Sequence, residues 1–241
     1  MNDKGVFLRA AWRYLIMANY AVDPEVLAPY VPARTKLDFY KGKTYASIVG
    51  FRFLDTKVLG VPVLLHRHFS EVNLRFYVRR RMGNGQWRRG TVFISELVPK
   101  PAVALLANTV YREQYSYAPI RYNIESFGDE LRVYYRWKKY AQWHHLYAKA
   151  RAQAIPMQEG SQEEFIAEHY WGYNRFSNKH TMEYGVEHPR WNYHKVIDYG
   201  IRADMARLYG SEFAPYLEQP ESVFLLDGSE VLIRQGNRLK I

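Results

Sequence analysis

Three polar side chains of complementary chemistry follow one another on one face of a predicted strand. In residues 69–78, FSEVNLRFYV, alternation places Glu71, Asn73 and Arg75 on the same side. Same-face residues lie about 7 Å apart along a strand. Facing a cleft, the carboxylate and the guanidinium could hold each other charged, with the amide between them. Facing solvent they would be an ordinary polar stripe, the usual place for charged residues. The residues alone leave both interpretations open.

Other common catalytic and binding chemistries are absent from the sequence. The chain has no cysteine, which excludes disulfides, thiolate metal sites and a cysteine nucleophile. It also lacks a glycine-rich phosphate loop, a serine nucleophile elbow and an H-E-x-x-H pattern. His66 and His68 could face one side of a strand, but two histidines without a nearby third ligand do not make a metal site. We therefore expect neither a metal nor a cofactor.

The composition favours one globular domain. The 241 residues are 48% hydrophobic, enough for a sizeable core, and we expect a single domain spanning residues 1–241. The start of the chain does not resemble a signal peptide and no apolar run is long enough to span a membrane, so a cytoplasmic location is expected. The 21 tyrosines suit half-buried strands and cavity walls, and they would also suit a homo-oligomer interface.

The formal net charge of +10 raises a second functional hypothesis. Arginines gather at the tip of one predicted hairpin, at positions 79, 80, 81, 88 and 89. Such a tip could grip a phosphate backbone, so a nucleic-acid or anionic-surface binding module is the alternative function. A solvated turn is the simpler explanation, and no recognised nucleic-acid module is present.

The pattern of elements favours a mainly β (α+β) fold. Predicted hairpins pair residues 37–40 with 43–54, 69–80 with 87–97, 121–125 with 130–137, and 222–226 with 230–235. Short helices are expected at 24–30 after Asp23, at 102–111, at 162–168 after Ser161 and at 203–209. Residues 8–22 favour a strand over a helix, and 137–154 fit either. Strands joined mostly as hairpins indicate an antiparallel sheet system or barrel with peripheral short helices.

Five stretches, in their order and spacing, resemble the uncharacterised YqjF-like family, a domain of unknown function related to the acetoacetate decarboxylase superfamily. They are residues 22–32 (VDPEVLAPYVP), 69–78, 90–97 (GTVFISEL), 116–122 (SYAPIRY), and 168–191 with EHYWGYNR and GVEHPRW. The resemblance covers most of the chain. It implies an acetoacetate decarboxylase-like closed antiparallel β-barrel with an interior ligand cavity and flanking helices.

The resemblance also implies a set of cavity residues. The decarboxylase relatives use a lysine that forms a Schiff base with a β-keto acid, a second lysine that lowers its pKa, an arginine and two glutamates. In this chain the arginine corresponds to Arg13, one glutamate to Glu71, the other to a position near Ser47, and the lysine pair to positions near Gln114 and Tyr115. A glutamine cannot form an imine.

Schiff-base chemistry is therefore not expected. No lysine occurs between residues 101 and 137, so simple acetoacetate decarboxylation would need a distant lysine such as Lys138 or Lys149. Whether the protein is an enzyme stays open. The primary hypothesis is a cavity protein for a small organic acid or carbonyl compound, with Glu71 as the catalytic acid or base. The expected ligand-binding residues are Arg13, Asn73, Arg75, Arg112, Gln114, Tyr115 and Tyr122, although a surface arginine or a tyrosine packing layer would explain several of them equally well.

Overall fold

Strands dominate the computed structural model, which describes residues 5–63, 67–99, 115–177 and 179–240. The strands are β1 (Val6–Val22), β2 (Lys36–Leu37), β3 (Thr44–Val58), β4 (Val61–Pro62), β5 (Phe69–Arg81), β6 (Trp87–Val98), β7 (Tyr115–Tyr117), β8 (Ile120–Phe127), β9 (Glu130–Lys139), β10 (Gln142–Pro156), β11 (Trp171–Ser177), β12 (His180–Glu187), β13 (Asn192–Arg202), β14 (Ser222–Arg234) and β15 (Asn237–Lys240). The helices are α1 (Pro24–Leu27), α3 (Gln162–Ala167) and α4 (Met205–Tyr209), with 3-10 turns η1 (Ala28–Tyr30) and η2 (Ala214–Tyr216). The predicted mainly β fold is confirmed, and no helix in the described ranges could cross a membrane.

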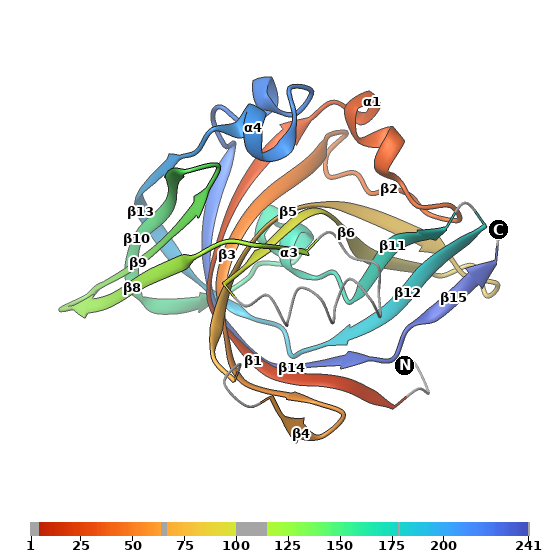
Figure 1. Ribbon diagram of the computed structural model, residues 1–241, viewed down its shortest axis with the longest axis horizontal. Coiled ribbons are helices and arrows are strands. Elements are labelled where there is room, and N and C mark those ends of the chain that lie inside the picture. The colour runs from red at the N-terminus through yellow and green to blue at the C-terminus, as the bar shows by residue number, and fades with distance from the viewer. Residues whose placement is uncertain (1–4, 64–66, 100–114, 178, 241) are drawn as a thin grey trace.

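Seven strands close into a ring (Figure 1). Their order is β12-β11-β6-β5-β3-β1-β14, and a short β12–β14 ladder that begins at Val186↔Ile233 completes the circle. The ring is not a regular antiparallel barrel, because β11 pairs with β6 in the parallel direction, at Trp171↔Gly90 and Gly172↔Thr91. Strands β13, β10, β9 and β8 continue from β14 as an arm outside the ring.

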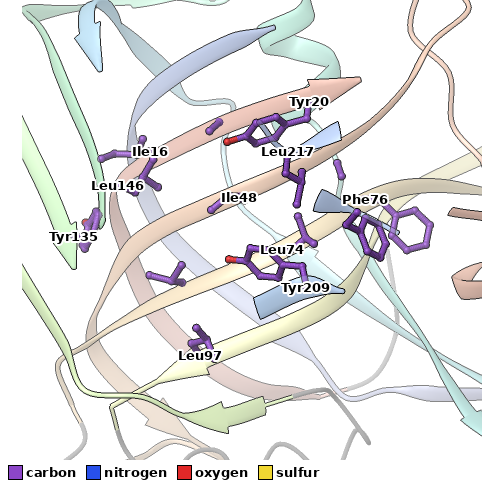
Figure 2. Packing of buried hydrophobic residues seen from close by; sticks show 14 of the residues in the cluster. Ile16, Tyr20, Ile48, Leu74, Phe76, Leu97, Tyr135, Leu146, Tyr209 and Leu217 are labelled. Atoms are coloured by element: carbon purple, nitrogen blue, oxygen red, sulfur yellow. The ribbon is translucent and has the colours of Figure 1, made fainter. Parts of the chain in front are cut away.

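Strand β5 is buried on both faces, which decides between the two interpretations of its polar residues. On one face, Leu74 and Phe76 belong to a hydrophobic core that includes residues of the arm and of α4 (Figure 2). The opposite face carries the polar residues and packs into a second hydrophobic cluster through Phe69 and Tyr77. All residues from Phe69 to Val78 are buried. The polar stripe of β5 therefore faces the interior and not solvent.

Two predicted helix starts, after Asp23 and after Ser161, are confirmed. Asp23 caps α1 by accepting a hydrogen bond from the backbone N–H of Glu25 at 2.9 Å. Ser161 caps α3 in the same way, accepting from the N–H of Glu164 at 3.2 Å. Helix α3 buries its last three residues and leads directly to His169, which lines the cavity described below.

Two predicted hairpins are wrong, for different reasons. Strand β2 pairs with β5 instead of β3, and the turn at 41–42 closes only an isolated bridge between Tyr40 and Lys43. The tail does not turn at 227–229, because β14 continues through it as a partner of β1. Gly228 has φ +75°, and a Cβ there would lie 2.0 Å from the carbonyl oxygen of Trp12. This glycine permits close approach of two strands within the ring, a role that its Asp-Gly-Ser context does not distinguish from a turn.

Two further sequence predictions concern the segments 137–154 and 102–111. The segment 137–154, which fitted a helix or a strand, is strand: it covers the end of β9 and most of β10. The helix expected at 102–111 lies outside the described residues.

Candidate functional site

A cavity of about 280 Å³ lies inside the ring, and β5 supplies its polar wall. Residues from β1, β3, β6, β7 and β12 complete it, together with His169 after α3. Polar lining residues include Glu71, Asn73, Arg75, Glu96, Tyr115, His169 and His188, and much of the remaining wall is aromatic or aliphatic. A mostly apolar pocket with a few convergent polar groups has the composition of a small-molecule site.

Glu71 is a buried carboxyl with two hydrogen-bond donors. Its side chain accepts from Asn73 Nδ2 at 2.8 Å and from the Tyr115 hydroxyl at 3.1 Å, and the residue is 2% exposed. Burial raises the pKa of Glu71 to about 7, although the two hydrogen bonds and the positive charge of Arg75 oppose the rise. At neutral pH both the acid and the carboxylate are populated, which suits general acid–base chemistry.

Arg75 is a buried cation without a carboxylate partner. The residue is 8% exposed and lines the cavity. Its Nε has no hydrogen-bond acceptor, and its guanidinium forms no ion pair, among the residues that the structure describes. By contrast, the next arginines along β5, Arg79 and Arg80, contact Asp38 and Glu183. A buried unpaired charge is costly, so an anion bound beside Arg75 would gain an unusually strong partner.

A second carboxylate, Glu96, lines the same wall, and sequence analysis missed it. Simple alternation along 90–97 puts Glu96 on the face opposite Phe93. The structure has a β-bulge: Leu74 pairs with Ser95 and Arg75 with Phe93, so Ile94 is the extra residue. The bulge shifts the alternation and turns Glu96 into the cavity. In strand register, Glu96 lies beside Asn73 of β5 on one side and beside Tyr115 of β7 on the other.

Two histidines reach the cavity wall. The buried side chain of His169 has Nε2 3.5 Å from Oδ2 of Asp38, and its ring lies 4.5 Å from that of Tyr77. Burial lowers the pKa of His169 to about 4, against the opposing influence of Asp38. His188 stacks on Trp191 at 3.9 Å, and burial lowers its pKa to about 4 as well. Both imidazoles are therefore neutral at pH 7.

The structure does not bring all the expected residues to the cavity. Arg13 follows Trp12, which faces the cavity, and points elsewhere: its Nη1 donates to the carbonyl of Gly228 at 2.7 Å. Arg13, an expected ligand-binding residue, is therefore absent from the cavity lining. Tyr122 is 49% exposed and lies against Arg52, with 3.6 Å between its ring centre and the guanidinium carbon, instead of covering the cavity. Ser47, near the position implied for a second glutamate, bonds Asn19 and Tyr77 and is absent from the lining.

Arg112 and Gln114 lie outside the described residues, so their expected roles stay predictions. Tyr115, at the place implied for the lysine pair, is described and contacts Glu71 as stated above. No lysine lines the cavity in the described part of the chain. Within those same ranges no cluster of three or more potential metal ligands occurs.

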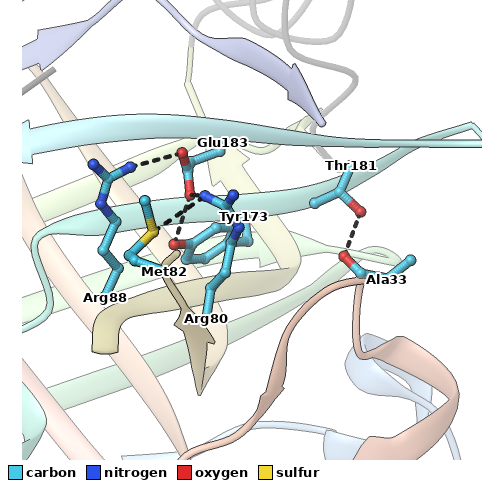
Figure 3. Close-up of polar contacts among 7 residues, drawn as sticks. All are labelled: Ala33, Arg80, Met82, Arg88, Tyr173, Thr181 and Glu183. Atoms are coloured by element: carbon cyan, nitrogen blue, oxygen red, sulfur yellow. Dashed lines mark hydrogen bonds and ion pairs between the residues drawn. The ribbon is translucent and has the colours of Figure 1, made fainter. Parts of the chain in front are cut away.

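The arginine-rich hairpin tip is mostly paired within the chain (Figure 3). Glu183, 2% exposed on β12, accepts from Arg80 at 2.6 Å, Arg88 at 3.0 Å and the Tyr173 hydroxyl at 2.9 Å. Arg89 contacts Asp38 at 2.6 Å in the same way. These arginines fasten the β5–β6 hairpin to its neighbours, so the structure offers no support for a polyanion-binding tip.

We expect Arg88→Met to lower the free energy of unfolding by ~1–2 kcal/mol, because one charge-assisted bond to Glu183 is lost while Arg80 and Tyr173 remain. Urea denaturation measures the change. Arg81→Met is the matched control, since Arg81 forms no ion pair within the described ranges and should cost much less. Equal losses in the two variants would contradict the structural role of Arg88.

Sequence comparisons identify the family to which the chain belongs. Residues 9–230 match the family DUF2071, described as an uncharacterized conserved protein. The chain belongs to this family. It is also similar to the uncharacterized protein YqjF of Bacillus subtilis (strain 168), with 28% identity over 187 residues, which are 76% of this chain and 74% of the relative.

Solved structures share the fold of this DUF2071 member at low sequence identity. Acetoacetate decarboxylase from Legionella pneumophila superposes with a TM-score of 0.64 at 14% identity, covering 99% of this chain and 90% of that one. The enduracididine biosynthesis enzyme MppR complexed with pyruvate gives 0.67 at 11% identity, over 99% and 91%. An acetoacetate decarboxylase-like enzyme from Sphingomonas wittichii RW1 gives 0.65 at 12%, over 98% and 94%. These likenesses confirm the acetoacetate decarboxylase-like fold implied by the sequence.

Proposed function

We propose that this protein binds a small organic acid, with or without a further carbonyl group, inside the ring, with the acid group beside Arg75. The observation that carries the proposal is the buried side chain of Arg75 on the wall of a cavity, where its Nε has no acceptor and its guanidinium forms no ion pair among the described residues. A carboxylate would form charge-assisted, bidentate hydrogen bonds with it. Asn73 Oδ1 and Trp12 Nε1, also on cavity-lining residues, have no partner in the described ranges and could bind further polar atoms of the ligand.

Glu71 is the residue best placed to act on such a ligand. In its protonated form it can donate to a carbonyl oxygen, and as a carboxylate it can accept a proton from the carbon next to the carbonyl. Arg75 would stabilise the negative charge that develops on oxygen in either reaction. The pyruvate complex of the fold relative MppR supports a ligand of this class.

The proposal excludes a lysine Schiff base. The described cavity wall contains no lysine, and Tyr115, near the implied lysine positions, is a hydrogen-bond donor to Glu71. A phenol cannot form an imine with a carbonyl compound. On the described wall, chemistry would therefore proceed by proton transfer at Glu71 and without a covalent amine adduct.

Calorimetric titration of the full chain with acetoacetate, butyrate and butyramide tests the proposal. We expect the two carboxylates to bind and to compete, and the neutral amide not to bind, because only the acids can pair with Arg75. Intact mass after borohydride treatment with acetoacetate should show the unmodified chain. Binding of the amide as tight as that of the acids, or a trapped lysine adduct, would contradict the proposal.

A further inference from the structure

We propose that the ligand carries an aromatic ring or a comparable branched apolar body in addition to its acid group; this inference rests on the proposed function and specifies its substrate class. The cavity volume of about 280 Å³ is the first observation. An apolar cavity of ~150 Å³ already accepts benzene. The cavity therefore has room for a ring together with a three-carbon acid, and a short keto acid alone would leave much of it unfilled.

One end of the cavity is a box of aromatic side chains. Trp12 on β1 meets Phe51 and Phe53 of β3 edge-on, with ring centres 5.2 and 5.6 Å apart. Phe53 stacks on Phe69 with ring centres 4.5 Å apart, and the ring centre of Trp191 lies 6.3 Å from that of Trp12. All five residues line the cavity. An aromatic cluster that lines a cavity favours edge-on or offset contact with a further aromatic ring inside that cavity.

The aromatic box and the charged group lie at opposite ends of the same strand face. Along β5 the cavity-facing residues run from Phe69 through Glu71 and Asn73 to Arg75. Phe69 pairs with Phe53 and Glu71 with Phe51, so the aromatic residues gather at the first end. Phe51 is the member of the box nearest to Arg75 along the strand: its partner Glu71 is two same-face steps from Arg75, roughly 13 Å of strand, and the charge of Arg75 acts on Glu71. A ligand with its acid at Arg75 and its carbonyl near Glu71 would direct its remaining carbon atoms toward the box.

Pyruvate and phenylpyruvate provide the direct test, because they share one head group and differ by the ring. We expect calorimetry on the full chain to give a dissociation constant about 30-fold lower for phenylpyruvate, since the ring leaves water for an apolar site. Phe51→Leu should weaken phenylpyruvate binding about tenfold and pyruvate binding much less. Phe127→Leu is the matched control, because Phe127 is 78% exposed and outside the cavity.

The outcomes separate this inference from the proposed function. Equal affinities for pyruvate and phenylpyruvate, or an equal effect of Phe51→Leu on both, would overturn the aromatic-body inference and leave acid binding intact. Binding of neutral phenylacetamide as tight as that of phenylpyruvate would overturn acid recognition while supporting the aromatic box. Binding of none of the three would overturn both. Circular dichroism of Phe51→Leu establishes that the variant is folded. Trp191→Phe repeats the comparison of pyruvate and phenylpyruvate binding at another member of the box.

Discussion

Replacing Arg75 by methionine is expected to weaken binding of keto acids and simple carboxylates about 100-fold or more, without destabilising the fold. Removing one partner of a buried charge pair costs roughly 2–5 kcal/mol in binding. In the free protein Arg75 forms no ion pair among the described residues, and Glu71, whose pKa its charge lowers, is only partly ionised at neutral pH, so the loss of Arg75 removes a buried charge that is only weakly compensated. Methionine is of similar length and apolar, and such replacements are often neutral or stabilising.

The two readouts for this variant are calorimetric titration and urea denaturation. Arg75→Lys is the matched control: it keeps the charge but not the bidentate geometry, and it should retain part of the affinity. A methionine variant that binds acids as well as the original chain would remove Arg75 from the site. A loss of several kcal/mol in unfolding free energy would show that Arg75 is a structural ion-pair partner.

Replacing Glu71 by glutamine should change the pH dependence of stability. The folded-state pKa of about 7 lies above the ordinary glutamate pKa of 4.5, so between these pH values the folded chain keeps a proton that the unfolded chain has lost. The resulting penalty is absent below pH ~4.5, grows as the pH rises and is complete above pH ~7. The original chain should therefore lose roughly 3 kcal/mol of stability across this window relative to Glu71→Gln.

Urea denaturation of both proteins at pH values from 4.5 to 8 measures this difference. Glu125→Gln is a matched control on the exposed arm, where the same neutralisation should produce no comparable pH trend. A difference between the original chain and Glu71→Gln that stays constant with pH would show that Glu71 does not hold its proton on folding. A difference that grows in favour of the original chain at high pH would show a carboxylate stabilised by Arg75.

Alternation and capping rules predicted much of the fold because they depend on neighbouring residues. The strand at 69–78 and its hairpin with 87–97 were predicted from sequence, as were the caps at Asp23 and Ser161. The inward direction of Glu71, Asn73 and Arg75 could not be decided locally. It follows from the second layer that the arm and α4 place over the opposite face of β5.

The errors arise where long-range geometry overrides local patterns. The bulge at Ile94 turns Glu96 inward against simple alternation, and Gly228 permits close strand approach where its neighbours favour a turn. Arg13 was assigned to the cavity by resemblance, but its neighbour Trp12 occupies the inward position. The ion pairs of the basic hairpin tip could not be predicted locally for a similar reason, since the carboxylate partners Asp38 and Glu183 are distant in sequence.

A crystal structure of the full chain soaked with phenylpyruvate tests the central claim most directly. We predict density inside the ring, with the carboxylate in hydrogen-bonding contact with the guanidinium of Arg75, the ring among Trp12, Phe51 and Phe53, and no covalent bond to the protein. Continuous density between the ligand's carbonyl carbon and a lysine nitrogen, or a carboxylate bound away from Arg75, would contradict the account.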